Sequence, residues 1–212
     1  MRSLPDAVVI LAGGAGRRLG GAAKPVLSVG GRPMLHRVLA AVAESTTRVV
    51  VGPAGLPLPA GVVQTREEPP GGGPVAALAA GLARVPASAV DLAVLAADLP
   101  LLTREAVARL RSAAVGYDGA VYLDGTGRPQ WLCGVWRVAA VRRALTQEVS
   151  GGGADAADGE GAAARFAGVP LWRVLAGLRV RPVSAPTGPP VWWDCDTEDD
   201  LEAARRWADG GP

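Results

Sequence analysis

The sequence predicts a single-domain α/β fold, a three-layer sandwich in which helices cover both faces of a mostly parallel central sheet. Short apolar runs alternate with helix-like segments along most of the chain, an order typical of parallel sheets. A chain of 212 residues with 49% hydrophobic residues can form one domain with a complete core. No internal repeat or second domain is visible, so residues 1–212 are interpreted as one domain.

The first half of the chain alternates most regularly. Two fully apolar runs predict buried strands, and Leu92–Ala97 is expected to be central in the sheet. Pro33 and the Gly73–Pro74 pair suit helix starts, and Thr103 is a suitable N-cap. The predicted strands are Ala7–Leu11, Arg48–Val51, Gly61–Thr65 and Leu92–Ala97, and the predicted helices are Pro33–Ala43, Val75–Arg84 and Arg104–Ser112.

The second half is less regular. Residues 124–127 read as a turn between two strands. Residues 150–161 are rich in Gly, Ala and Asp and predict a mobile loop, whose acidic residues are interpreted as solubilising rather than metal-binding. The predicted strands are Gly119–Leu123, Gln130–Arg137, Arg179–Val183 and Val191–Trp193, and the predicted helices are Val138–Leu145, Leu171–Ala176 and Thr197–Ala208.

Composition and charge argue against several classes of protein. The net charge of +2 is small and no basic stripe with interleaved aromatic residues is visible, so nucleic acid is not an expected partner. No apolar run has membrane-spanning length, and the N-terminus shows no signal-peptide organisation. Cys133 and Cys195 lack metal-ligand spacing, which favours two reduced thiols in a cytoplasmic protein. His36 has no carboxylate motif nearby and is not expected to be catalytic.

The glycine-rich run that follows the first strand predicts a phosphate site. Glycines let backbone N–H groups approach an anion, and Arg18 and Lys24, the only lysine of the chain, supply positive charge. A Walker loop is excluded because Pro25 follows Lys24, and a dinucleotide-binding fingerprint is excluded because Leu19 stands where its third glycine is needed. The alternative is a surface loop with an incidental lysine.

Asp98 ends an otherwise apolar strand, where a carboxylate needs a partner. Magnesium is a suitable partner, because it binds one or two carboxylates and completes its shell with phosphate oxygens and water. The alternative is a turn cap before Pro100. In open α/β sheets ligands bind beyond the carboxyl ends of the strands, which is where Asp98 lies.

A second acidic pair, Asp194 and Asp196, alternates along an extended segment, so both side chains point to one side. Asp196 is the preferred second metal contact and Asp194 the next; the alternative makes Asp196 an ordinary residue before a helix. Thr197 and Asp200 resemble a capping box at the start of that helix.

Together these motifs resemble those of the molybdenum cofactor guanylyltransferases, which belong to the glycosyltransferase-A-like nucleotidyltransferases with a Rossmann-like fold. The resemblance is carried by the glycine-rich run at residues 11–25, by Asp98-Leu99-Pro100 and by residues 196–201. Residues 67–78 resemble the family's Glu-Asp, then Gly-Pro-Leu-Ala-Gly, segment. Glu68 stands where an aspartate is usual, and Glu198 replaces a usual proline.

The resemblance implies a site. It assigns the Leu11–Gly13 backbone to the base, Arg18 and Lys24 to the phosphates, and the acidic residue before the Gly-Pro segment to the nucleoside. Arg128, Pro129 and Gln130 lie on the acceptor side. The implied catalytic residues are Arg18, Lys24 and Asp98; the implied nucleotide-binding residues are Leu11, Ala12, Gly13, Gly14, Lys24, Glu68 and Asp98; and the implied ligands of Mg²⁺ are Asp98 and Asp196.

The implied reaction transfers GMP from GTP to molybdenum-molybdopterin, forming molybdopterin guanine dinucleotide and pyrophosphate. Enzymes that use CTP, or another phosphorylated acceptor, are the alternatives. A different class is a non-catalytic nucleotide-binding partner of cofactor-insertion proteins. Molybdoenzyme apoproteins or their chaperones are the protein partners that the resemblance suggests, with no nucleic acid and no membrane.

Overall fold

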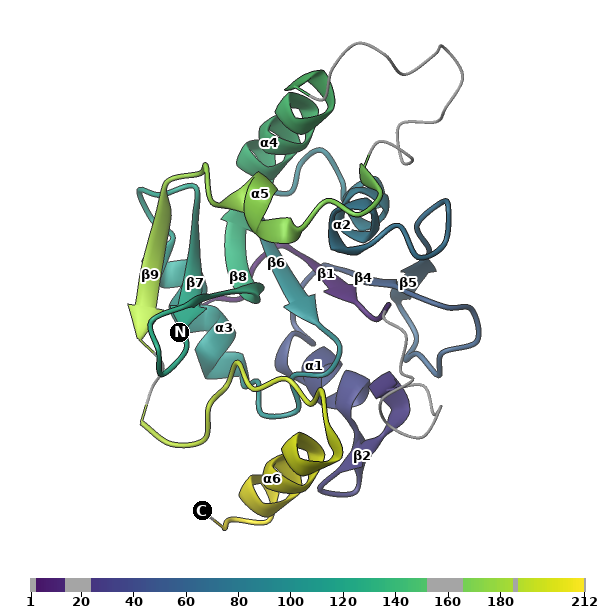
Figure 1. Cartoon of the computed structure of the whole chain (residues 1–212), viewed down its shortest axis with the longest axis vertical. Helices are drawn as coiled ribbons and strands as arrows, with labels where there is room; N and C mark the ends of the chain where they lie inside the picture. The colour runs from purple at the N-terminus through teal and green to yellow at the C-terminus, as the bar shows by residue number, and fades with distance from the viewer. Residues whose placement is uncertain (1–2, 14–23, 152–165, 185–186, 212) are drawn as a thin grey trace.

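A computed structural model describes residues 3–13, 24–151, 166–184 and 187–211. It confirms the α/β fold: helices cover both faces of a seven-stranded sheet of order β5-β4-β1-β6-β8-β7-β9 (Figure 1). Only β8 among these strands runs antiparallel to its neighbours. The strands are β1 (Ala7–Leu11), β4 (Thr47–Val51), β5 (Val62–Thr65), β6 (Asp91–Ala96), β7 (Gly119–Leu123), β8 (Pro129–Arg137) and β9 (Val180–Ser184).

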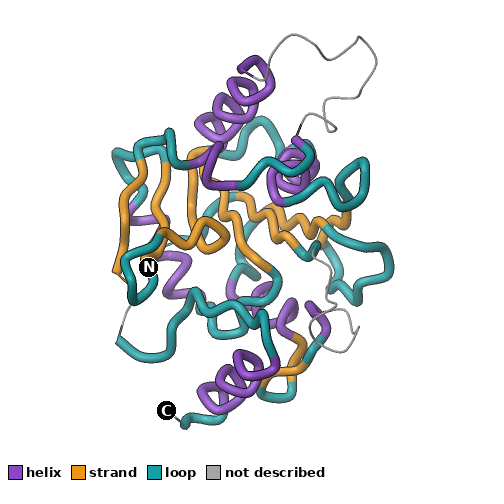
Figure 2. Tube along the Cα trace, in the orientation of Figure 1, coloured by secondary structure: helices purple, strands orange, loops and turns teal. Residues whose placement is uncertain are grey.

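Each face of the sheet has its own apolar core. Helices α1 and α3 cover the core on one face, and helices α2, α4 and α5 cover the core on the other face (Figure 1). A smaller cluster lies under α6, beside a short hairpin of β2 and β3 that stands away from the main sheet (Figure 2). The helices are α1 (Met34–Ala41), α2 (Pro74–Leu82), α3 (Arg104–Ala113), α4 (Val138–Gly151), α5 (Leu171–Leu175) and α6 (Glu198–Ala208), with a 3-10 turn at η1 (Lys24–Val26) and hairpin strands β2 (Ser28–Val29) and β3 (Arg32–Pro33).

Most predicted elements are confirmed. β1 and β7 have the predicted bounds, and β6 is the central strand of the seven. Thr103 caps α3 by accepting a hydrogen bond from the Ala106 N–H, and Thr197 and Asp200 form the predicted capping box on α6. Both cysteines are free and buried, as expected. None of the helices in the described ranges combines the length and the apolar character needed to cross a bilayer.

Three predictions of secondary structure are wrong. Residues 191–193 form a turn, in which the Trp193 N–H donates to the Pro190 carbonyl, because the preceding prolines cannot donate to a sheet ladder. Helix α4 continues to Gly151, so Ser150 is helical; the rest of the predicted mobile loop lies outside the described residues, apart from Gly151. Pro33 belongs to β3 and precedes α1 rather than opening it.

The β2–β3 hairpin was not predicted, although its signal is present in the sequence. Gly30 and Gly31 have positive φ angles of 54° and 72°. Two consecutive residues of this kind form the tight turn that matches the twist of a hairpin. The hairpin supports α6, which carries Asp196 at its N-terminal side.

Close packing of α2 on the sheet requires Gly81. A Cβ atom at this position would lie 2.5 Å from Val9 Cγ1 and 2.9 Å from Val51 Cγ2. Real Cβ contacts are not this short, so the glycine lets the helix approach β1 and β4 directly. This approach fixes the N-terminal end of α2, which reaches the cavity described below.

We expect Gly81→Ala to lower the free energy of unfolding by up to about 2 kcal/mol. Overpacking costs about 1–3 kcal/mol, of which the better helix propensity of alanine returns about 1 kcal/mol. Chemical denaturation would measure the loss. Gly125→Ala is the matched control, because nothing lies within 4 Å of its added Cβ. Equal losses in the two variants would contradict the packing argument.

Candidate functional site

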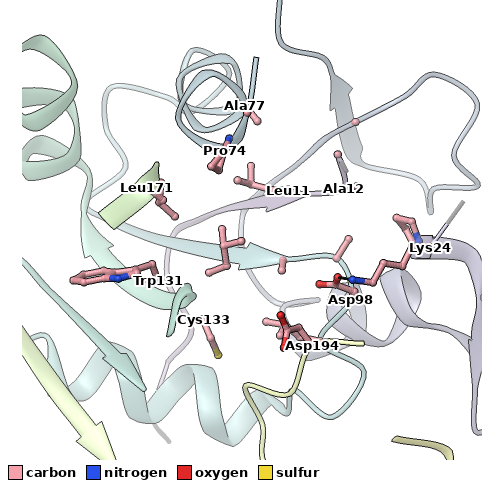
Figure 3. A pocket seen from close by; sticks show the side chains of 18 of the residues that line it. Leu11, Ala12, Lys24, Pro74, Ala77, Asp98, Trp131, Cys133, Leu171 and Asp194 are labelled. Atoms are coloured by element: carbon pink, nitrogen blue, oxygen red, sulfur yellow. Dashed lines mark ion pairs between the residues drawn. The ribbon is translucent and has the colours of Figure 1, made fainter. Parts of the chain in front are cut away.

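A cavity of about 1000 Å³ opens at the carboxyl edge of the parallel strands (Figure 3). The residues that follow β1 and β6 line it, as do residues 129–133 at the start of β8. Because β8 is antiparallel to β6, its first residues lie at the same edge as the end of β6. Single-ligand sites usually measure about 300–1,000 Å³, so this cavity lies at the upper end of that range.

Lys24 joins two carboxylates in the wall of the cavity. Its Nζ forms an ion pair with Asp98 Oδ2 and donates to Asp196 Oδ1 at 2.7 Å (the pair with Asp98 is dashed in Figure 3). Lys24 begins η1, Asp98 follows β6, and Asp196 precedes α6. The Cys195 N–H also donates to the Asp98 carbonyl, at 3.3 Å, which holds the two acidic segments together.

The charge on Lys24 depends on these partners. Burial acts to lower the pKa of Lys24, but the charges and hydrogen bonds of Asp98 and Asp196 outweigh it, and the pKa is raised above its ordinary value. Lys24 is therefore an ammonium at neutral pH. In the structure Asp98 and Asp196 share the Lys24 ammonium, whereas the sequence assigned Lys24 to the phosphates and the two carboxylates to Mg²⁺.

A third carboxylate, Asp194, lines the same cavity. Burial raises the pKa of Asp194, and the negative charges of Asp196 and Asp98 raise it further. Three carboxylates and one ammonium leave an excess of negative charge, and hard carboxylate oxygens are ligands that Mg²⁺ prefers. No group of three or more acidic, His or Cys side chains in the described residues is arranged as a complete metal site. Asp98 and Asp196 could therefore hold a divalent cation whose other ligands are phosphate oxygens and water.

The wall formed by Leu11, Ala12 and Gly13 is part of the sheet edge. The Ala12 N–H donates to the Val51 carbonyl at 2.7 Å, and the Leu11 carbonyl accepts from Ala97 N–H at 3.0 Å. These bonds fix the backbone that the sequence assigned to the base. Gly73 and Pro74, at the N-terminal end of α2, also line the cavity (Pro74 is labelled in Figure 3), and the N-terminus of a helix favours an anion.

Glu67 lies against this wall and was not predicted. Glu67 is only 7% exposed. Its Oε1 atom accepts a hydrogen bond from the Gly71 N–H at 3.0 Å. Its Oε2 atom is buried and has no hydrogen-bond partner among the described residues. A Cβ added at Gly13 would lie 3.9 Å from Glu67 Oε1. Glu68, the predicted residue, is exposed and does not line the cavity, so the geometry favours its neighbour Glu67. The signal in the sequence that could have indicated Glu67 is Gly71, whose backbone N–H lies four residues later and donates to the Glu67 carboxylate.

The cavity brings together most of the other predicted residues. Gly14, Arg17 and Arg18 lie outside the described residues. Pro129 and Gln130 line the cavity on the expected acceptor side, but Arg128 does not. Sequence reasoning missed Arg66 and three tryptophans that line the cavity, Trp131, Trp172 and Trp192. The predicted residues that line it are Leu11, Ala12, Gly13, Lys24, Asp98, Asp194 and Asp196.

Comparison with known proteins shows what this chain is similar to. Residues 8–166 match the model of the MobA-like NTP transferase domain. The chain is 33% identical over 151 residues to a molybdenum cofactor guanylyltransferase of Bradyrhizobium sp. (strain ORS 278), a match that covers 66% of this chain and 71% of the relative. It is 37% identical over 139 residues to a probable molybdenum cofactor guanylyltransferase of Mycobacterium tuberculosis (strain ATCC 25618 / H37Rv), covering 64% of this chain and 69% of the relative.

Solved structures share the fold at lower identity. The 2-C-methyl-D-erythritol 4-phosphate cytidylyltransferase of Thermus thermophilus has a TM-score of 0.68 and 22% identity, and the match covers 97% of this chain and 100% of that one. The molybdopterin-guanine dinucleotide biosynthesis protein A of Archaeoglobus fulgidus has a TM-score of 0.68 and 19% identity, covering 96% and 99%. These likenesses support the fold alone.

Because the Lys24 ammonium occupies both carboxylates, we expect it to compete with divalent cations. Without nucleotide, Lys24→Ala should bind Mn²⁺ about tenfold more tightly than the unaltered protein, a change of about 1.4 kcal/mol. Electron paramagnetic resonance of free Mn²⁺ would measure the affinity. Arg104→Ala is the control, because it releases Glu44 from an ion pair that does not line this cavity. Unchanged affinity in Lys24→Ala would contradict the competition.

Proposed function

Because this chain belongs to the MobA-like NTP transferase family, we propose that it transfers GMP from GTP to the terminal phosphate of molybdenum-molybdopterin. The products are molybdopterin guanine dinucleotide and pyrophosphate. The observation that carries the proposal is the Asp98–Lys24–Asp196 cluster, which lines the same cavity as the Leu11–Gly13 wall and the start of β8. The names of the relatives in Bradyrhizobium and Mycobacterium support the choice of nucleotide and acceptor.

The proposed chemistry is a direct in-line displacement. An oxygen of the acceptor phosphate attacks the α-phosphorus of GTP, the bond from this phosphorus to the bridging oxygen breaks, and pyrophosphate leaves with the electron pair. The attacking phosphate is already an anion, so no general base is required. The role of the protein is then to bring two anions together and to neutralise their charge.

Each residue of the cluster has a proposed role. Lys24, together with Arg18 from the glycine-rich run, holds the triphosphate and stabilises the charge that develops on pyrophosphate. Asp98 and Asp196 are the residues that would hold Mg²⁺, which supplies charge neutralisation at the phosphates when it is bound. The N-terminal end of α2, at Gly73 and Pro74, adds a positive dipole to the nucleotide side.

Glu67 supports guanine as the base. Guanine presents two adjacent donors on one edge, the N1–H and the 2-amino group, which match a carboxylate acceptor. Glu67 Oε2 is a buried acceptor without a partner among the described residues, and an unsatisfied buried acceptor gains most from such a donor. Cytosine has a single amino donor on the corresponding edge, so it satisfies this carboxylate less well.

The reaction is tested by mass spectrometry of product after mixing the protein with Mg²⁺, molybdenum-molybdopterin and GTP, CTP or ATP separately. We expect the guanine dinucleotide from GTP alone. A cytosine dinucleotide would assign the chain to the CTP-dependent alternative, and absence of product with all three nucleotides would overturn the proposal.

The role of Asp98 is tested by Asp98→Asn, which keeps the size of the side chain and removes its charge. We expect turnover to fall at least about 100-fold, since a loss of about 2.7 kcal/mol of transition-state stabilisation has this effect. Circular dichroism and thermal unfolding should show an intact fold. Asp199→Asn, an exposed position on α6 that does not line the cavity, is the control. Full activity of Asp98→Asn would remove Asp98 from the site.

Base recognition by Glu67 is tested with ITP, which lacks only the 2-amino group of guanine. The unaltered protein should prefer GTP to ITP by about tenfold or more in kcat/KM, the scale of one hydrogen bond to a charged group. Glu67→Gln keeps an oxygen for the Gly71 N–H and should lose most of this preference. If both proteins show the same ratio of GTP to ITP, Glu67 does not contact the 2-amino group.

A further inference from the structure

The cavity continues past the carboxylates into an aromatic compartment, formed by Gln130, Trp131, Leu132, Cys133, Leu171 and Trp172. None of these six residues is charged: burial raises the pKa of the Cys133 thiol to about 12, so it stays neutral. The whole chain contains only six Trp, two Tyr and one Phe, yet two of these aromatic residues line this end of one cavity. The compartment therefore suits a flat, uncharged group rather than a phosphate.

An irregular strand pairing builds one wall of the compartment. Val121 of β7 pairs with Gly134 of β8, whereas Leu123 pairs with Pro129. Four residues of β8, Gln130–Cys133, therefore stand opposite the single residue Tyr122. A bulge of this kind re-aims side chains, and here it brings Trp131 and Cys133 to the cavity wall (Figure 3).

Two tryptophans give the compartment its aromatic surface. Trp131 stacks on the fully buried Trp136, with ring centroids 6.1 Å apart and an interplanar angle of 21°, so its ring is held in place. Trp172 is 57% exposed although its neighbour Leu171 is buried and anchors α5. A large aromatic ring left exposed at the rim of a cavity is available to stack on a ligand.

Gln130 adds a directed hydrogen-bond acceptor. Its amide nitrogen donates to Asp124 Oδ2 at 3.0 Å, and Asp124 is itself held by the N–H groups of Thr126 and Arg128. The Arg128 N–H and the Thr126 hydroxyl lower the pKa of Asp124, so it remains a carboxylate that can only accept. The amide orientation is therefore fixed. Gln130 Oε1 is left without a hydrogen-bond partner among the described residues and can accept from a ligand N–H.

We propose that the aromatic compartment binds the pterin ring system of the acceptor, stacked on Trp172 and Trp131, while Gln130 Oε1 accepts a hydrogen bond from a ring N–H. A pterin is a flat, neutral nitrogen heterocycle with N–H and amino donors on one edge, which is the chemistry this compartment offers. The inference rests on the proposed function for the identity of the acceptor. It places the pterin ring against Trp131 and Trp172 and directs the terminal phosphate of the acceptor toward Lys24, Asp98 and Asp196, which line the same cavity.

Binding of 6-hydroxymethylpterin, which has neither phosphate nor metal, tests the proposal by calorimetry. Trp172→Ala should weaken this binding about tenfold, on the scale of base stacking on aromatic side chains, and Gln130→Met should weaken it severalfold. Trp207→Phe, which alters a tryptophan outside the cavity that packs on Trp193, should leave it unchanged. Guanosine binding should not depend on Trp172.

A kinetic measurement separates this inference from the proposed function. In GMP transfer, Trp172→Ala should raise the KM for molybdenum-molybdopterin about tenfold and leave the KM for GTP unchanged. Equal pterin affinity in Trp172→Ala and the unaltered protein, or no pterin binding at all, would overturn the inference even if GMP transfer occurs. Pterin binding that depends on Trp172, without GMP transfer, would overturn the reaction and keep the pterin subsite.

Discussion

The ion-paired cluster of Lys24 with Asp98 and Asp196 is the interaction on which the arrangement of the site depends. The donor and acceptor of its 2.7 Å bond are 172 positions apart in the chain. One ammonium therefore ties the segment after the glycine-rich run to the end of β6 and to the start of α6. Without a cation between them, the two carboxylates would repel each other, because like charges at short range are unfavourable. The contact therefore adds to the Cys195–Asp98 backbone hydrogen bond in joining these segments, and it sets the charge at this wall of the cavity.

The topology of the sheet explains why two different compartments meet at this cluster. The carboxyl ends of β1 and β6 supply a regular backbone wall, because parallel strands end at one edge. Antiparallel β8 brings its first residues to the same edge, and its bulge opposite Tyr122 makes that wall irregular and aromatic. If all strands were parallel, both sides of the cavity would be formed by the carboxyl ends of strands and the loops that follow them. The single reversed strand gives the cavity one polar, backbone-lined side and one side lined with tryptophan.

The sequence predicted the features that depend on local pattern. Runs such as Ala7–Leu11 are apolar because both faces of a central strand are buried, and the single lysine stood out against a background of arginines. The sequence could not show whether Glu67 or Glu68 faces the cavity. Which of these adjacent acids is buried depends on the hydrogen bond from the Gly71 N–H and on the position of Gly13 close to Glu67. The sequence also missed the aromatic compartment, because a bulge arises from the register between two strands and leaves no periodic signal in either of them.

Three carboxylates in this cavity set a condition on the binding of the two phosphorylated substrates proposed for it. Asp98, Asp194 and Asp196 repel any phosphate that arrives without a counter-charge, and Lys24 neutralises only part of their charge. Affinity for the organic parts of the substrates therefore has to come from elsewhere, and the structure offers it in the Leu11–Gly13 wall with Glu67 and in the aromatic compartment. Binding energy gained at those two walls can hold the phosphates close together at the cluster, where repulsion would otherwise keep them apart. Separation of recognition from charge neutralisation is the expected design for a reaction whose main obstacle is the meeting of two anions.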